Sequence, residues 1–249
     1  MIILLCLFAF STACIAEETD YWNWKGLKHQ EAKNYTDALF YFDKATSQDH
    51  NHIDSWVRKG DTFRAMKEYN ASLENYQAAL EIDKNKTQAW LGLVEAFTAL
   101  NDYDDAASAA ARITEIDPKN KANWLREGNI LQTQGYYREA AIKYDGALAL
   151  DPQYKDALYK KGVSLLAMGN ASQAMELFDL ILEIDPNNKG AYNAKGLAFE
   201  AEGRFPEALE AYNKAREIDP KWTQPTANKI HVLWALGNNT EAVKAFLEV

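Results

Sequence analysis

The feature that most constrains this chain is a period of 34 residues. One site of the period recurs without insertion or deletion through seven copies, and it holds Gly26, Gly60, Val94, Gly128, Gly162, Gly196 and Ile230. A unit of this length can bury its apolar residues only against neighbouring units. The period therefore predicts a stacked array over most of the chain rather than one or two globular domains.

Each copy of the period indicates two amphipathic helices joined by a short turn. In the copy from Lys121 to Asp151, apolar residues recur three and four positions apart on both sides of Gly135. That spacing places them on one face of each helix, and the glycine marks the turn. The apolar and small residues of this copy are Trp124, Gly128, Leu131, Tyr137, Ala140, Tyr144 and Ala147.

Three other positions of the period each favour one steric type. Large residues precede the glycine site by four positions, small residues follow it by twelve, and aromatic residues follow it by sixteen. Small residues let paired helices approach closely, and aromatic rings fill the space between successive hairpins. The three positions hold Trp22, Trp56, Trp90, Trp124, Leu158, Tyr192 and Thr226; then Ala38, Ser72, Ala106, Ala140, Ala174, Ala208 and Ala242; then Phe42, Tyr76, Ala110, Tyr144, Phe178, Tyr212 and Phe246.

This combination of period, residue types and turns resembles the tetratricopeptide repeat (TPR) family. The resemblance covers residues 19–249, with repeats starting near residues 19, 53, 87, 121, 155, 189 and 223. It implies an all-α fold, a right-handed superhelical solenoid of antiparallel helix pairs. Val94, Ile230, Ala110 and Ser72 depart from the pattern. Each is expected to disturb packing at its own hairpin by about 1–3 kcal/mol without abolishing the fold.

Composition argues against several classes of function. A net charge of −9 disfavours a nucleic-acid partner, because that affinity comes from Lys and Arg at phosphates. The repeats contain no phosphate-binding glycine loop, His-Glu-x-x-His pattern or cysteine, so we expect neither an enzyme nor a cofactor. His50 and His52 lack a third ligand in the sequence nearby. They therefore indicate a solvated turn rather than a metal site.

Residues 1–16 carry no charged side chain and predict a signal peptide or lipoprotein signal. Ser11-Thr12-Ala13-Cys14 is similar to a lipobox and slightly favours lipidation of Cys14. Cys14-Ile15-Ala16 also fits cleavage after Ala16, and an uncleaved anchor is the third possibility. We expect an extracytoplasmic protein, secreted or anchored at the cell envelope through its N-terminus. The alternative is a cytoplasmic protein with residues 1–16 unprocessed.

Five Asn-x-Ser/Thr sequons predict glycosylation if the chain is exported, and they lie at Asn34, Asn70, Asn85, Asn170 and Asn238. All five fall in or beside expected turns. A structural alternative is that Thr36, Ser172 and Thr240 cap the second helix of their hairpins.

Four linkers between hairpins contain Asp-Pro, which is expected to end the preceding helix at a constant position. The first two linkers lack the proline, having His50 and Lys84 in its place, and are expected to be softer.

The resemblance also implies a ligand groove lined by the first helix of each hairpin. The sequence lacks the Lys and Asn pairs with which chaperone-binding TPR proteins hold a terminal carboxylate, so a polar or weakly basic protein segment is the expected ligand. Trp24, Tyr159, Trp222 and Trp234 lie outside the packing positions and are further candidates for contact. The predicted groove residues are Asn23, Leu27, Val57, Asp61, Arg64, Leu91, Glu95, Leu125, Asn129, Gln132, Tyr159, Val163, Asn193, Leu197 and Trp234.

These observations predict an exported TPR scaffold or adaptor that binds a protein or peptide in its groove. One alternative is a glycosylated cell-surface structural protein that self-associates through its last hairpin, from Thr223 to Val249. A cytosolic TPR assembly factor is the other.

Overall fold

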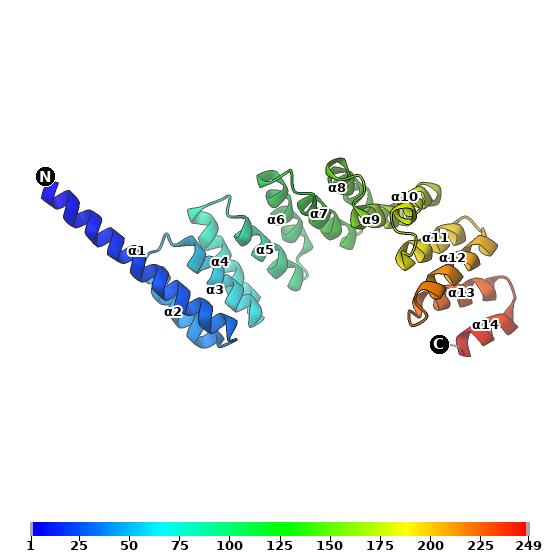
Figure 1. Ribbon diagram of the computed structural model, residues 1–249, viewed down its shortest axis with the longest axis horizontal. Coiled ribbons are helices and arrows are strands. Elements are labelled where there is room, and N and C mark those ends of the chain that lie inside the picture. The colour runs from blue at the N-terminus through cyan, green and yellow to red at the C-terminus, as the bar shows by residue number, and fades with distance from the viewer. Residues whose placement is uncertain (1, 248–249) are drawn as a thin grey trace. The chain divides into compact units, whose positions relative to one another are not determined.

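The computed structural model describes residues 2–247, and it describes side chains from residue 15 onward. Over this range every helix or strand that forms is an α-helix (Figure 1). The residues group into two compact units, Met1–Asp117 and Pro118–Val249, which we call unit 1 and unit 2. The sequence-based prediction of an all-α fold of antiparallel helix pairs is confirmed.

In the described part of the chain, fourteen helices make seven hairpins, and we call the first helix of each hairpin helix A and the second helix B. Unit 1 contains α1 (Ile2–Glu31), α2 (Tyr35–Gln48), α3 (Ile53–Ala65), α4 (Tyr69–Ile82), α5 (Thr87–Ala99) and α6 (Tyr103–Ile116). Unit 2 contains α7 (Lys121–Thr133), α8 (Tyr137–Leu150), α9 (Lys155–Ala167), α10 (Ala171–Ile184), α11 (Lys189–Ala201), α12 (Phe205–Ile218), α13 (Gln224–Ala235) and α14 (Asn239–Leu247).

Within each unit, helix A forms the inner layer. In unit 1, α1 contacts α3 and α3 contacts α5, while in unit 2 each of α7, α9 and α11 contacts the next helix A. Among the described residues of either unit, no helix B contacts the helix B of the next hairpin. The helix A side is therefore the shorter side of each stack. Residues that project from it converge on a common surface.

Close contact between a glycine and an aromatic ring holds most hairpins together. A Cβ atom added to Gly128 would lie 2.6 Å from Cε1 of Tyr144, and one added to Gly162 would lie 2.5 Å from Cε1 of Phe178. Both rings are fully buried. Glycine at this site is thus required by the ring it faces, because protein interiors leave no room for the extra atom.

In hairpin 3 the larger residue of this pair is on helix A and the smaller one is on helix B. Val94 occupies the glycine site, Ala110 occupies the aromatic site, and both are buried. The large and small residues have exchanged helices, so total volume is approximately kept. Treating the two residues as separate packing faults was wrong, because each compensates the other.

Hairpin 7 fills the space between its two helices with a different residue. Ile230 is buried with Ala242 and Ala245, and the ring of Phe246 is 65% exposed. The isoleucine therefore supplies the apolar volume that an aromatic ring supplies elsewhere, and Phe246 is not a core residue.

The turn between helix A and helix B uses left-handed backbone in every hairpin, but with different residues in the two units. In unit 1 the residues with positive φ are Lys33 (59°), Lys67 (66°) and Asn101 (61°). In unit 2 they are Gly135, Gly169, Gly203 and Gly237, at 72–82°. Only glycine adopts this conformation without steric cost.

Aspartate, rather than proline, marks the end of helix B. Asp49 and Asp83, in the linkers that lack proline, accept a hydrogen bond at 2.9 Å from the amide two residues later. Asp151 and Asp219, which precede prolines, accept the same bond at 3.1 Å. Helices α2 and α4 end at the same position of the repeat as α8 and α12. Proline is thus not needed to stop the helix.

The expected helix-capping role of the sequon hydroxyls is wrong. Helix α2 begins at Tyr35 and α10 begins at Ala171, so Thr36 and Ser172 already lie inside the helices. The Ser172 hydroxyl instead donates to Glu202 at 2.6 Å. Thr240 likewise lies inside α14, one residue after its start.

The backbone of α1 continues unbroken through the predicted signal segment and into hairpin 1 (Figure 1). No helix among the described residues is both long and apolar enough to cross a membrane. The side chain of Cys14 lies outside the described residues, and its lipidation stays a prediction.

Candidate functional site

Helix A presents one candidate surface in each unit, and each surface is described by itself. The unit 1 face consists of Asn23 and Leu27 from α1, Val57, Asp61 and Arg64 from α3, and Leu91 and Glu95 from α5. The unit 2 face consists of Leu125, Asn129 and Gln132 from α7, Tyr159 and Val163 from α9, Asn193 and Leu197 from α11, and Trp234 from α13. Helical spacing of three or four residues puts the members from one helix on one side. Contact between successive helices A then aligns them into a surface.

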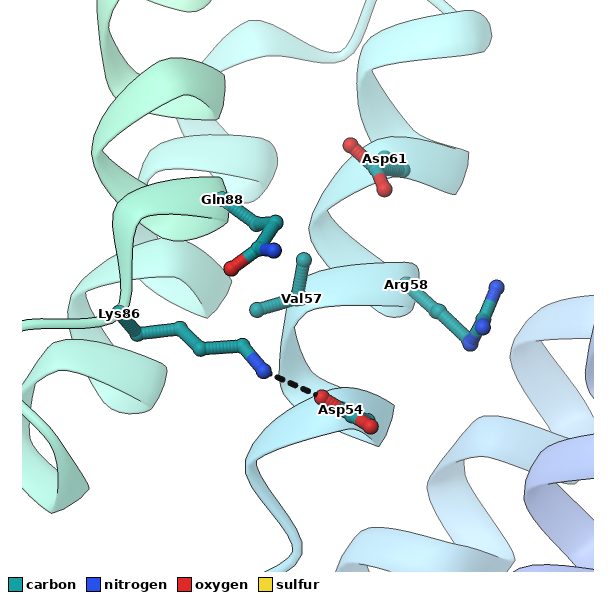
Figure 2. Close-up of a pocket in the computed structure, with 6 residues that line it drawn as sticks. All are labelled: Asp54, Val57, Arg58, Asp61, Lys86 and Gln88. Atoms are coloured by element: carbon teal, nitrogen blue, oxygen red, sulfur yellow. Dashed lines mark hydrogen bonds and ion pairs between the residues drawn. The ribbon is translucent and has the colours of Figure 1, made fainter. Parts of the chain in front are cut away.

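An open pocket of about 300 Å³ lies on the unit 1 face between α3 and α5 (Figure 2). Figure 2 shows Val57 between the two helices, with Asp54 below it, Asp61 above it, and Lys86 and Gln88 approaching from the α5 side. Lys86 binds Asp54 at 2.6 Å, and its ammonium lowers the pKa of that carboxyl group. The pocket therefore has an apolar floor and charged walls. Its lining residues are Asp54, Val57, Arg58, Asp61, Lys86 and Gln88.

Arg64 links the helices of the unit 1 face. Its guanidinium forms ion pairs with Asp61, at 3.3 Å on the same helix, and with Glu95 on α5. Its Nε also donates to the Tyr76 hydroxyl at 3.2 Å. That hydroxyl donates in turn to Asp61 at 2.7 Å. Burial, followed by the nearby Asp61 carboxylate, raises the pKa of Tyr76, so the phenol stays protonated and keeps the network in place.

Polar groups on the first part of the unit 2 face are satisfied within the protein. The Tyr144 hydroxyl lies 3.0 Å from Asn129 Oδ1 and 3.3 Å from Gln132 Oε1. Gln132 Nε2 donates to the Lys160 carbonyl and to Ser164 Oγ, at 3.1 and 3.0 Å, on the neighbouring helix A. This network orders α7 against α9. The side chains of Asn129 and Gln132 therefore already have hydrogen-bond partners within the protein.

Glu200 makes a second polar cluster on the unit 2 face. It accepts a hydrogen bond from the Tyr212 hydroxyl at 2.8 Å, and its other oxygen lies 2.7 Å from His231 Nδ1. Asn193 is buried, and it accepts a hydrogen bond from Asn228 at 2.9 Å. Asn193 thus ties α11 to α13, while Glu200 and His231 lie nearer the surface.

Apolar side chains fill the rest of the unit 2 face. Tyr159 is partly buried against Phe178, with ring centroids 5.9 Å apart. Val163 is partly exposed, whereas Leu197 and Trp234 are 40% and 55% exposed. Exposed apolar groups gathered on one surface indicate a site for another molecule.

The predicted groove residues differ in how far they are exposed to solvent. Val57 and Asn193 are buried and can serve as floor and support rather than as ligand contacts. Leu27, Leu91, Leu125, Asn129 and Gln132 are partly exposed, and Glu95 is exposed. None of these placements tests binding, so the groove assignment stays a prediction.

Sequence reasoning missed four residues of the unit 1 pocket, namely Asp54, Arg58, Lys86 and Gln88. Asp54 and Gln88 occupy the same position of the repeat, the second residue of helix A in α3 and α5. Lys86 immediately precedes α5 as its N-cap residue. The signal that would have found Asp54, Lys86 and Gln88 is their place at the start of helix A, where the chain enters the inner layer. Arg58 is the sixth residue of α3 and gives no such signal.

All five predicted glycosylation sites, at Asn34, Asn70, Asn85, Asn170 and Asn238, are exposed. Ser72, the hydroxyl residue of the second sequon, is fully buried. His52 is held at Nδ1 by Ser55, at 2.8 Å, and lies 3.2 Å from Asp20 at Nε2, so it acts as a cap for α3.

A family model described as a tetratricopeptide repeat matches residues 63–126 and 131–197, and a second of the same description matches residues 190–221. These stretches cover more than half of the chain. No curated protein matches the sequence.

Three solved structures illustrate the similarity in fold. YrrB, described as a TPR protein with an unusual peptide-binding site, is 21% identical with a TM-score of 0.63, covering 76% of this chain and 97% of its own. MamA is 25% identical with a TM-score of 0.62, covering 68% and 92%. PilW, a type IV pilus biogenesis factor, is 20% identical with a TM-score of 0.64, covering 78% and 90%.

Proposed function

Because the chain belongs to the tetratricopeptide repeat family, we propose that it is an exported scaffold that binds a segment of another protein on its helix A faces. Such repeats are typically non-enzymatic modules for protein interaction. The observation that carries the proposal is the gathering of partly exposed side chains on the inner helices, above all Leu197 and Trp234 in unit 2.

The chemistry of the two faces indicates what kind of segment would fit. The unit 1 pocket offers carboxylates at Asp54 and Asp61 beside the cations Lys86 and Arg58, around the apolar Val57. The unit 2 face offers apolar contact at Tyr159, Leu197 and Trp234. We infer that the ligand carries charged residues where it meets unit 1 and large apolar residues where it meets unit 2. YrrB, which shares the fold, has a peptide-binding site, and this supports a peptide ligand.

A display selection of random peptides against the full chain tests this function. Selected peptides should lose at least about tenfold in affinity for the Leu197→Asp variant, because a charge in an apolar contact costs about 1.4 kcal/mol or more. The matched control is Leu180→Asp, since Leu180 is 43% exposed on helix B against 40% for Leu197 on helix A. Equal affinity for both variants, or a selection that returns only peptides sensitive to Leu180→Asp, would place binding elsewhere.

Export and anchoring belong to the proposal and rest on the sequence of residues 1–16. Mass spectrometry of the protein from its native cells would distinguish lipidation of Cys14, cleavage after Ala16 and an intact N-terminus. An intact, unmodified Met1 in a cytoplasmic fraction would favour the cytosolic assembly factor instead.

Glycosylation at Asn34, Asn70, Asn85, Asn170 and Asn238 is likewise proposed. Asn70 forms a special case, because the buried Ser72 is accessible to a modifying enzyme only before hairpin 2 folds. Site-resolved mass spectrometry should therefore find lower occupancy at Asn70 than at Asn34. Unmodified asparagine at all five positions would remove this part of the proposal.

One observation favours a second function, self-association as a structural protein. Helix α14 exposes Val243, Phe246 and Leu247. An exposed apolar face of this kind is typical of an interface between chains. Light scattering after size exclusion should then show oligomers that Phe246→Asp dissociates, whereas a monomer at all concentrations would leave the adaptor function alone.

A further inference from the structure

Five aromatic rings form a continuous surface on the outer side of hairpin 1. The ring of Trp24 stacks on Tyr21, with centroids 6.3 Å apart, and Tyr21 contacts Trp22 at 5.0 Å. Trp22 stacks on Tyr41 at 5.8 Å, and Tyr41 contacts Phe40 at 5.3 Å. Tyr21, Trp24 and Phe40 are all exposed. We call these five residues the aromatic surface.

Within each unit, the position of Tyr21 is the place where a later hairpin receives its predecessor. Tyr21 is the third residue of the repeat, a position held later by Ser55, Ala89, Asn123, Ala157, Ala191 and Pro225, all of them buried. Ala157 packs into the core of hairpin 4, with Tyr144, and Ala191 packs into the core of hairpin 5, with Phe178. Small residues there admit the preceding hairpin. A tyrosine does not.

A second contact between hairpins is altered in the same way. Lys59, Lys161 and Lys195, the seventh residue of their repeats, reach back to Asp43, Asp145 and Asp179 of the preceding hairpin. Lys25 holds that position in hairpin 1, and its ammonium lies instead over the rings of Tyr21 and Tyr41, 4.9 and 5.2 Å from their centroids. Hairpin 1 is therefore not shaped to receive another TPR hairpin, including one from a second copy of this chain.

The chemistry of the aromatic surface suits the interface of a lipid bilayer. Lys44 adds a second ammonium, 4.2 Å from the Trp22 ring centroid and 4.8 Å from that of Phe40. Tryptophan, tyrosine and lysine together are the side chains that lie at the headgroup level, with their rings among acyl chains and their polar ends in water. Of the nearby carboxylates, Glu18 accepts a hydrogen bond from Gln48, Asp20 lies 3.2 Å from His52 and Asp43 binds Lys59, while Glu17 is exposed.

The course of α1 indicates that a lipid bilayer, rather than a protein, contacts the aromatic surface. The same unbroken helix carries residues 2–16 of the sequence, which have no charged side chain, and then Tyr21 and Trp24. Tyr21 lies five helical steps after Ala16, a rise of about 8 Å along the axis. The headgroup layer of one leaflet is roughly 5–8 Å thick. Trp24 lies about 12 Å beyond Ala16 along the axis, so its ring stays within this layer when α1 is inclined to the membrane. An inclined apolar segment that enters the acyl chains would therefore bring both Tyr21 and Trp24 to the membrane surface.

We propose that the aromatic surface of hairpin 1 lies in the headgroup layer of a lipid bilayer and holds unit 1 against the membrane. This inference rests on the N-terminal anchoring in the proposed function, and it does not depend on ligand binding to the helix A faces. Hairpin 1 would then be the membrane-contacting part of unit 1, and Lys25 and Lys44 would favour anionic lipids.

Quenching of tryptophan fluorescence by brominated lipid tests the proposal. The full chain is incorporated into vesicles of phosphatidylcholine and phosphatidylglycerol, with brominated or ordinary acyl chains. Trp24→Phe should remove a large part of the bromine-dependent quenching, on the order of half. The matched control is Trp234→Phe, because Trp234 is 55% exposed in unit 2 and Trp24 is 52% exposed. The control should quench like the unchanged protein.

Circular dichroism of both variants checks that helical content is unchanged. Equal quenching of both variants would overturn the proposal, because the Trp24 ring would then lie away from lipid. So would an unchanged accessibility of Trp24 to aqueous acrylamide when vesicles are added, since a ring in the headgroup layer is shielded. A failure of either kind leaves peptide binding on the helix A faces untouched, which the Leu197→Asp variant tests separately.

Discussion

In unit 1 the hairpin turns place Lys33, Lys67 and Asn101 in left-handed backbone, whereas unit 2 uses glycine at every equivalent position. Unit 2 also has ion pairs along one edge that recur with the period, in which Lys121, Lys155 and Lys189 bind the aspartates 30 residues later. In unit 1 the equivalent positions hold Thr19, Ile53 and Thr87. The hairpins of unit 2 thus combine unstrained glycine turns with a repeated Lys–Asp ion pair. The hairpins of unit 1 have strained turns and no lysine at the position that forms this ion pair.

The helix A faces differ in a parallel way. Unit 1 presents an ionic network centred on Arg64, and unit 2 presents the exposed apolar side chains of Leu197 and Trp234. A shared backbone period therefore fixes where the inner surface lies without fixing its chemistry. The difference teaches that the exposed residues of the helix A faces can change while the packing residues keep the same hairpin.

The largest expected effect concerns the exchanged pair in hairpin 3. Ala110→Tyr should destabilise unit 1 by about 3 kcal/mol, because the new ring meets the buried Val94 instead of a glycine. Adding Val94→Gly should recover most of that loss by recreating the arrangement of hairpin 4. Urea denaturation followed by circular dichroism measures both variants. Losses that simply add would show that the two sites do not share one space.

Exchanging the turn residues should give an effect of about 1 kcal/mol and of opposite sign in the two units. Lys67→Gly should stabilise unit 1, because it relieves left-handed strain at φ 66°. Gly169→Lys should destabilise unit 2 for the same reason. Thermal denaturation of both variants checks the signs, and a Lys67→Gly protein that melts earlier would contradict the strain argument.

The smallest effect concerns the ion pairs along the edge of unit 2. The Lys155 ammonium, 3.0 Å from Asp185, is the main cause that lowers the pKa of this carboxyl group. The pair therefore adds stability above the ordinary pKa range of aspartate, and that stability is lost as pH falls through the lower folded value. Lys155→Met should raise the Asp185 pKa and flatten the loss of stability on acidification.

NMR titration of the side-chain carboxyl carbons would measure that pKa directly. Lys160→Met is the matched control, since it removes the same charge nearby without this ion pair. A fall in the Asp185 pKa in the Lys155 variant would contradict the assignment. High salt should reduce the difference, because both groups are solvent-exposed.

Much of the fold follows from the sequence because steric requirements repeat. Gly128 and Gly162 must be glycine beneath a buried ring, so the 34-residue period predicts the hairpins and their order. Exchanges of volume between the two helices of a hairpin could not be predicted in this way. Val94 with Ala110, and Ile230 with the exposed Phe246, each depend on a partner in the other helix that a single position does not reveal.

The candidate site was less predictable for a physical reason. Of the predicted groove residues, Leu197 and Trp234 are exposed, but helical spacing did not show that Val57 and Asn193 are buried. The pocket also draws Lys86 from the residue just before α5, where side-chain direction depends on the linker and not on the helical period. Partner identity depends on groove chemistry that the packing residues do not encode.

The central claim, that the inner helices hold another polypeptide, is tested most directly in native cells with a photo-crosslinking amino acid at Leu197. The control places the same group at Leu180, which is equally exposed on helix B. We predict one dominant adduct of defined mass at Leu197, reduced when Trp234 is changed to alanine, and little adduct at Leu180. The same adducts at both positions, or an adduct at Leu180 alone, would contradict the account.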